Sequence, residues 1–106
     1  LMRYAWAESP AGMHGPHGMG LGYPAAKAIA RLVPDLAHPE VRRLVDSTNI
    51  WLRSGALAGL TEARALGIET LLARVLAEHP AALVADQAAV GLRTLQASRQ
   101  AAVVAR

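Results

Sequence analysis

Proline placement constrains this chain more than any other feature. Prolines at positions 24, 34, 39 and 80 divide residues 24–106 into segments, and each segment carries a helical pattern. Proline fits the first turn of a helix, but inside one it removes a hydrogen bond and clashes with the preceding turn. We therefore expect helices to start at Pro24, at Pro39 and just after Pro80, and the first of them to stop before Pro34.

The apolar residues between these breaks recur at i, i+3, i+4 and i+7, the spacing of an amphipathic helix. The pattern predicts helices over 24–33, 39–54, 62–79 and 81–103, with Gly55 as a C-cap, Thr61 as an N-cap and Gly67 as a kink or turn. The expected core-facing residues are Ala25, Ala28, Ile29 and Leu32, then Val41, Leu44, Val45, Thr48 and Leu52, then Ile68, Leu71, Leu72, Val75 and Leu76, and finally Val84, Ala88, Gly91, Leu95, Ser98 and Ala102.

Length and composition support an all-α fold with one core. The chain has 106 residues, is rich in alanine and leucine, and has only 4% aromatic residues. We expect a compact bundle of four to five helices. Residues 10–24 are dense in glycine and proline, which predicts a loop, so the expected division is an arm over 1–23 and a helical domain over 24–106. A short α-solenoid fragment is the alternative, because His38-Pro39 and His79-Pro80 are separated by a period typical of such repeats, about 40–47 residues.

Residues that could carry catalysis are sparse. The chain has no cysteine, which excludes disulfides and thiolate metal sites. No serine lies in a G-x-S-x-G motif. Glu78 is next to His79, but adjacent residues on a helix point about 100° apart and do not act as a pair. We therefore expect no catalytic residues and a non-enzymatic role.

The leading hypothesis is a protein-interaction or regulatory module that self-associates as a homo-oligomer. Ile50 falls opposite the apolar stripe of helix 39–54, Trp51 lies at its edge, and Arg53 is close by. Tryptophan and arginine are favoured at interface hot spots, so Trp51→Ala should weaken association by more than about 1 kcal/mol. The small residues of helix 81–103 offer either tight internal packing or a homodimer seam.

DNA binding is the second hypothesis. The net charge is +3 and the sequence pI is about 10.2. Residues 61–76 have the spacing of a helix-turn-helix, whose second helix would enter a major groove. Glu62 stands where that pattern wants an apolar residue, which counts against it. The candidate contacts to nucleic acid are Arg64, Thr70, Arg74, Arg93 and Arg99.

A metal site is the third hypothesis. Met13, His14, His17 and Met19 place two thioethers and two imidazoles within one short segment, which suits Cu(I), while nickel or zinc would need further ligands. Without such a site we expect no cofactor. No apolar run reaches the length of a membrane span, roughly 18 residues. Together with the lack of cysteine, this leads us to expect a cytoplasmic protein.

Overall fold

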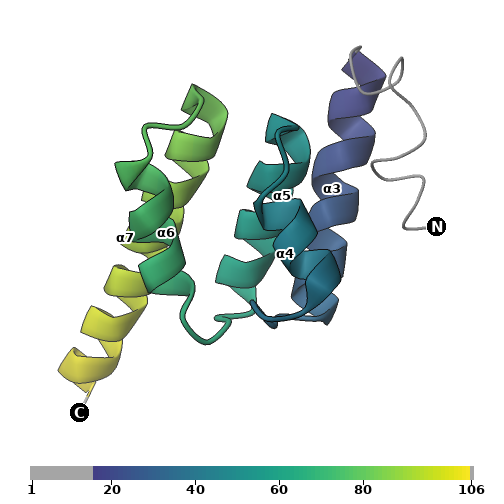
Figure 1. The fold of residues 1–106 in the computed structure, drawn as a ribbon. Coiled ribbons are helices and arrows are strands. Elements are labelled where there is room, and N and C mark those ends of the chain that lie inside the picture. The colour runs from purple at the N-terminus through teal and green to yellow at the C-terminus, as the bar shows by residue number, and fades with distance from the viewer. Residues whose placement is uncertain (1–15, 106) are drawn as a thin grey trace.

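The structure, a computed structural model, describes residues 16–105 and is all-helical over that range, as predicted. It contains no strand between residues 16 and 105. The helices in chain order are α3 (Pro16–Leu32), α4 (Pro39–Val45), α5 (Ile50–Glu62), α6 (Ile68–Ala77) and α7 (Ala82–Ala105), arranged as a small bundle (Figure 1).

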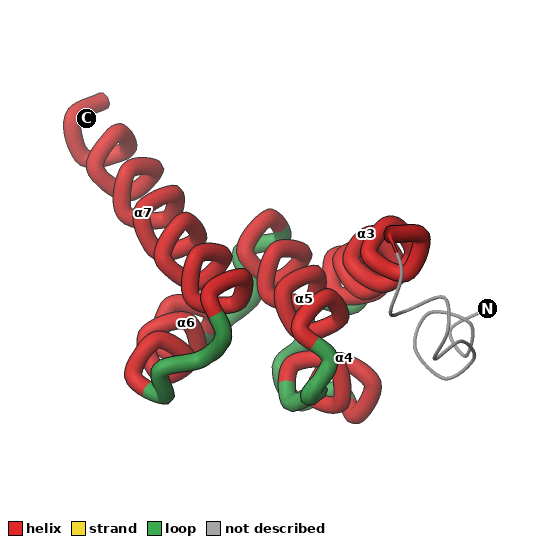
Figure 2. Tube along the Cα trace, turned by 90° about the horizontal axis from the view of Figure 1, so that it is seen from above, coloured by secondary structure: helices red, strands yellow, loops and turns green. Residues whose placement is uncertain are grey.

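The bundle has two layers. The long helices α3, α5 and α7 lie side by side in one row and run in the same direction, while the short helices α4 and α6 form a second row (Figure 2). Each short helix carries the chain back, so that the next long helix can lie parallel to the previous one. His38-Pro39 begins the short α4, whereas His79-Pro80 precedes the long α7. The two pairs therefore occupy different places relative to the short and long helices.

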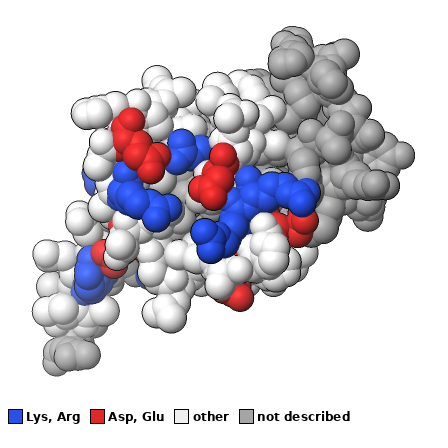
Figure 3. All heavy atoms as spheres, in the orientation of Figure 1, with Lys and Arg blue, Asp and Glu red and all other residues white. Residues whose placement is uncertain are grey.

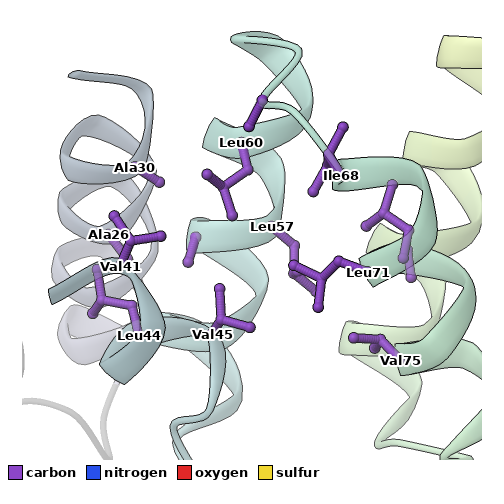
Figure 4. Packing of buried hydrophobic residues seen from close by; sticks show 14 of the residues in the cluster. Ala26, Ala30, Val41, Leu44, Val45, Leu57, Leu60, Ile68, Leu71 and Val75 are labelled. Carbon is purple, nitrogen blue, oxygen red and sulfur yellow. The ribbon is translucent and has the colours of Figure 1, made fainter. Parts of the chain in front are cut away.

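Helix α5 is the centre of the core. Every residue from Ser54 to Thr61 is buried, because α3, α4, α6 and α7 all pack around it. The largest fully buried side chains include Leu44 of α4, Leu57 of α5 and Leu72 of α6. Figure 4 shows Leu57 of α5 pointing toward Leu71 of α6, while Leu44 of α4 lies on the side of α3. Burying each such leucine contributes about 1.5–3 kcal/mol.

Two glycines allow the backbones of α3 and α5 to lie in direct contact. A Cβ added to Gly55 would lie 2.3 Å from the carbonyl oxygen of Tyr23, and one added to Gly59 would lie 2.3 Å from that of Lys27. The predicted C-cap at Gly55 is therefore wrong. This residue lies inside α5, and its missing side chain makes room for a neighbouring helix.

The predicted continuous helix over 39–54 is also wrong, because it is interrupted between α4 and α5. Asp46 is the C-cap of α4, and the Ser47 hydroxyl accepts a hydrogen bond from the backbone N–H of Asn49 at 3.0 Å. The Asn49 side chain in turn accepts from the N–H groups of Trp51 and Leu52, which starts α5. Such side chains compete for backbone hydrogen bonds and favour caps over helix interiors.

The N-terminal boundary differs from the prediction as well. Helix α3 begins at Pro16, and Pro24 lies inside it. The expected loop over 10–24 is therefore wrong for residues 16–24, while residues 1–15 lie outside the described range. An internal proline costs about 3 kcal/mol. The extensive packing of α3 on α5 offsets this cost.

The predictions for the second half of the chain are more accurate. Gly67 has φ +84°, a left-handed conformation that suits glycine, and it marks the predicted turn before α6. The α6 stripe of Ile68, Leu71, Leu72 and Val75 is buried as expected. Thr61, however, does not cap a helix. It lies within α5 and donates its hydroxyl to the carbonyl of Leu57 at 2.8 Å.

Candidate interaction surfaces

The C-terminal end of α7 projects beyond the other helices (Figures 1 and 2). Leu95 is the last buried residue of this helix. We call residues 96–105 the α7 end. From Gln96 to Val104 every side chain is exposed except Ser98, which is half-buried, and Val103 and Val104 are 65% and 82% exposed. At 1.5 Å per residue, about 15 Å of helix extends with little support.

Most of the small residues predicted to form a seam on α7 pack against other helices of the same molecule. Val84, Ala88, Gly91 and Leu95 are buried, so the expected tight internal packing is confirmed for these residues. At Gly91, an added Cβ would lie 2.9 Å from Leu72 and 3.0 Å from the hydroxyl of Thr61. Beyond Leu95 the same stripe continues as Ser98 and Ala102, where the helix leaves the body.

A groove of about 400 Å³ separates the α7 end from the loop between α5 and α6. Leu66, in that loop, is 95% exposed and lines the groove together with Ser98 and Ala102. Across the groove Arg99 bonds to Glu69 of α6 at 2.6 Å. Leu66 therefore faces Ser98 and Ala102 of the α7 end, while Val103 lines a separate hollow with Gln96, Arg99 and Gln100.

The predicted partner-binding residues Ile50, Trp51 and Arg53 lie together at the start of α5, in different environments. Ile50 is 37% exposed and Trp51 is half-buried. The Arg53 side chain is engaged internally: its Nε donates to the carbonyl of Val45 at 2.8 Å, and its guanidinium bonds to Glu78 at 2.9 Å. It thus joins the C-terminal ends of α4 and α6, where a cation is favourable.

A second groove, the front groove, lies between α4 and α6 and has a volume of about 480 Å³. Its lining combines apolar and charged residues. It consists of Leu36, Arg42, Val45, Asp46, Gly67, Thr70, Leu71 and Arg74. Of these, sequence reasoning had singled out Thr70 and Arg74, as DNA contacts. Arg42 and Leu36 were missed, since nothing in their spacing indicates that α4 and α6 face each other.

The residues predicted to contact DNA do not form one basic surface. Arg74 lies 4.0 Å from Glu78, and Arg99 is paired with Glu69. Over α4 and α6, basic and acidic side chains alternate (Figure 3). Helix α5 ends at Glu62 and α6 begins at Ile68, so the span 61–76 predicted as a helix-turn-helix contains only the last two residues of a first helix. Arg64 lies in the following turn with φ 54°, and Arg93 is exposed on α7.

The metal hypothesis falls largely outside the described residues. Met13 and His14 precede them, while His17 and Met19 belong to the first turns of α3 rather than to the expected loop. Within the part of the chain that the structure describes, no group of three or more histidine, aspartate and glutamate side chains is arranged to hold a metal ion.

Glu62, at the end of α5, has the clearest electrostatic environment. Its carboxylate bonds to Lys27 at 2.6 Å and to Arg31 at 3.2 Å, both on α3. The hydrogen bond from Lys27 is the largest cause that lowers the pKa of Glu62 below its ordinary value. Desolvation opposes it, and the hydrogen bond from Arg31 and the charges of both cations lower the pKa further. These ion pairs join α3 to α5 at the C-terminal end of α5.

No protein-family model, curated protein or solved structure matches this chain. Among the described helices, none is both long and apolar enough to cross a membrane.

Proposed function

We propose that this chain is a non-catalytic protein-interaction module that self-associates through the α7 end. The supporting observation is the exposed apolar surface of that end, with Val103 and Val104 at its tip and Leu66 beside it. A helix end without tertiary packing is marginally stable in water, because helices gain most of their stability from a packed face. A second copy lying against it would cover these residues, in the self-complementary arrangement of a two-fold dimer.

The positive charge of α7 determines how self-association should depend on salt. Arg93 and Arg99 lie on α7, and the chain has no acidic residue after Asp86. Arg99 is already paired with Glu69 of the same copy, so apolar contact has to supply the binding energy, and the remaining positive charge of α7 opposes it. Because salt screens exposed charges, self-association should strengthen as salt is raised, whereas binding to an acidic partner would weaken.

Sedimentation equilibrium of the full chain tests the proposal. Replacing both valines, Val103→Ser with Val104→Ser, should weaken self-association at least about tenfold. Val90→Ser is the matched control, since Val90 is also an exposed valine of α7, at 47%, but lies on the body of the bundle. A wild-type chain that stays monomeric at every concentration, or equal effects of both changes, would contradict the proposal.

The surface around Ile50 and Trp51 is the alternative place for a partner. Trp51→Ala in the same experiment separates the two surfaces: an effect larger than that of the valine pair would move the interface to the start of α5. A labelled mixed-sequence DNA duplex, titrated at low and at physiological salt, examines nucleic-acid binding, which would fall steeply with salt.

A further inference from the structure

The front groove is bounded at both ends by contacts between distant parts of the chain. At one end Leu36, from the loop between α3 and α4, approaches Gly67, so that a Cβ there would lie 3.4 Å from the leucine Cδ1. At the other end Arg53 bonds both to the carbonyl of Val45 and to Glu78. The front groove lies between these two contacts and is open to solvent. It adjoins the groove beside the α7 end, with which it shares Gly67 and Thr70, but of the two only the front groove is lined by Arg42 and Arg74.

Its dimensions favour a small molecule over a partner helix. The wall formed by α4 has seven residues, about 10 Å at 1.5 Å per residue. A partner helix is usually held by anchors over two turns or more, which needs a longer wall. The volume of about 480 Å³ lies in the range of small-molecule pockets, about 300–1,000 Å³.

The charged residues of the front groove indicate what kind of small molecule it would bind. Arg42 on α4 and Arg74 on α6 lie on opposite walls. Arg42 makes no ion pair with any described residue, although its neighbour Arg43 lies 3.6 Å from Glu40. Arg74 has only a 4.0 Å contact with Glu78, whose other carboxylate oxygen binds Arg53 at 2.9 Å. Asp46 is the acidic group of the lining, so the two walls carry a net positive charge.

We propose that the front groove binds a small amphipathic anion. The apolar body of the ligand packs on Leu36, Val45 and Leu71, and its carboxylate or similar acidic head lies between Arg42 and Arg74. Guanidinium groups bind carboxylates with paired, charge-assisted hydrogen bonds, and Thr70 offers a further donor at the rim. Such a ligand would also link α4 to α6, which contact each other little in the bundle.

Fluorescence titration with 8-anilinonaphthalene-1-sulfonate, an apolar anion of suitable size, tests this proposal on the full chain. We expect saturable binding to the wild type. Arg42→Gln and Arg74→Gln should each weaken it about tenfold, because each removes a charged hydrogen-bond donor. Arg43→Gln and Arg93→Gln remove the same charge outside the groove and should leave binding unchanged. Both groove arginines have exposed side chains, and thermal melts verify that the variants are folded.

An uncharged counterpart, N-phenyl-1-naphthylamine, separates the contribution of the head from that of the apolar body. Its binding should be at least about tenfold weaker and should not respond to the arginine changes. The proposal is overturned if the sulfonate does not bind saturably, if the uncharged probe binds as well, or if Arg43→Gln weakens binding as much as Arg42→Gln.

Discussion

The two faces of α5 show two ways to bring helices close together. Against α3, Gly55 and Gly59 face backbone carbonyl oxygens, and an added methyl group would lie 2.3 Å from each oxygen. On the other face, a Cβ added to Gly91 of α7 would meet side-chain atoms, at 3.0 Å from Thr61 of α5 and 2.9 Å from Leu72 of α6. A side-chain end can move at little cost, but a backbone carbonyl moves only with its helix. The α3 contact should therefore tolerate change far less than the α7 contact.

The largest effect is expected at the α3 contact. In Gly59→Ala the new methyl group would collide with the carbonyl of Lys27, so α3 and α5 must separate. We expect the free energy of unfolding to fall by about 2 kcal/mol, after a gain of about 1 kcal/mol in helix propensity. Gly91→Ala is the control and should change stability by less than about 1 kcal/mol. Urea unfolding at fixed protein concentration compares the two, and equal losses would remove the distinction between the faces.

Replacing Ser54 is expected to raise the stability of the protein, in contrast to the glycine substitutions. Ser54 shares the face of Thr61 by helical spacing, is fully buried, and its hydroxyl has no hydrogen-bond partner within the described residues. Because an unpaired buried hydroxyl is costly, Ser54→Ala should stabilise the protein by about 1 kcal/mol. A lower melting temperature for this variant would show that the hydroxyl is bound after all. Thr61→Val is the contrasting change, since the Thr61 hydroxyl is bonded.

Among the described side chains, one hydrogen bond connects the outer helices past α5. The Tyr23 hydroxyl, on α3, donates to Gln87 of α7 at 2.9 Å. Tyr23→Phe should lower the free energy of unfolding by about 1 kcal/mol. A double-mutant cycle with Gln87→Leu measures the coupling, and strictly additive losses would indicate that the two residues act independently.

The smallest expected effect is pH-dependent. Because Lys27 and Arg31 hold the pKa of Glu62 below its ordinary value of 4.5, the carboxylate stabilises the fold above that pH, and this contribution is lost as the pH falls through the lowered pKa. The difference in melting temperature between wild type and Glu62→Gln should therefore be constant above pH 4.5 and shrink below it. Glu69→Gln, which removes the ion pair with Arg99 on the α7 side, is the comparison. A difference that grows on acidification would contradict the assignment.

Sequence patterns predicted the α7 side better than the α3 side. The α6 stripe, the turn at Gly67 and the small residues of α7 follow rules in which the side chain itself decides the structure. Pro24 and Gly55 break those rules, because tertiary packing of α3 on α5 outweighs local preference. The interruption after Val45 did carry a signal in the run Asp46-Ser47-Thr48-Asn49, whose side chains all favour caps.

The candidate surfaces were harder to foresee. Ile50 is 37% exposed, but as the first residue of α5 and not on the back of a continuous helix over 39–54. The internal bonds of Arg53 depend on Glu78, which is 25 residues away in sequence. Arg42 and Arg74 line the same groove only because α4 and α6 lie in the same row of the bundle. Periodicity assigns a residue to one face of its own helix and carries no information about which other helix that face meets.

The parallel row of α3, α5 and α7 also gives the molecule a net helix dipole. These helices have 17, 13 and 24 residues, and the helices that oppose them have only 7 and 10. With about 3.5 D per peptide unit, the uncancelled part amounts to a dipole moment on the order of 100 D along the bundle. Its positive pole lies at the end where α5 and α7 begin. The field of this dipole therefore orients the protein, with one end of the bundle toward an approaching charged molecule.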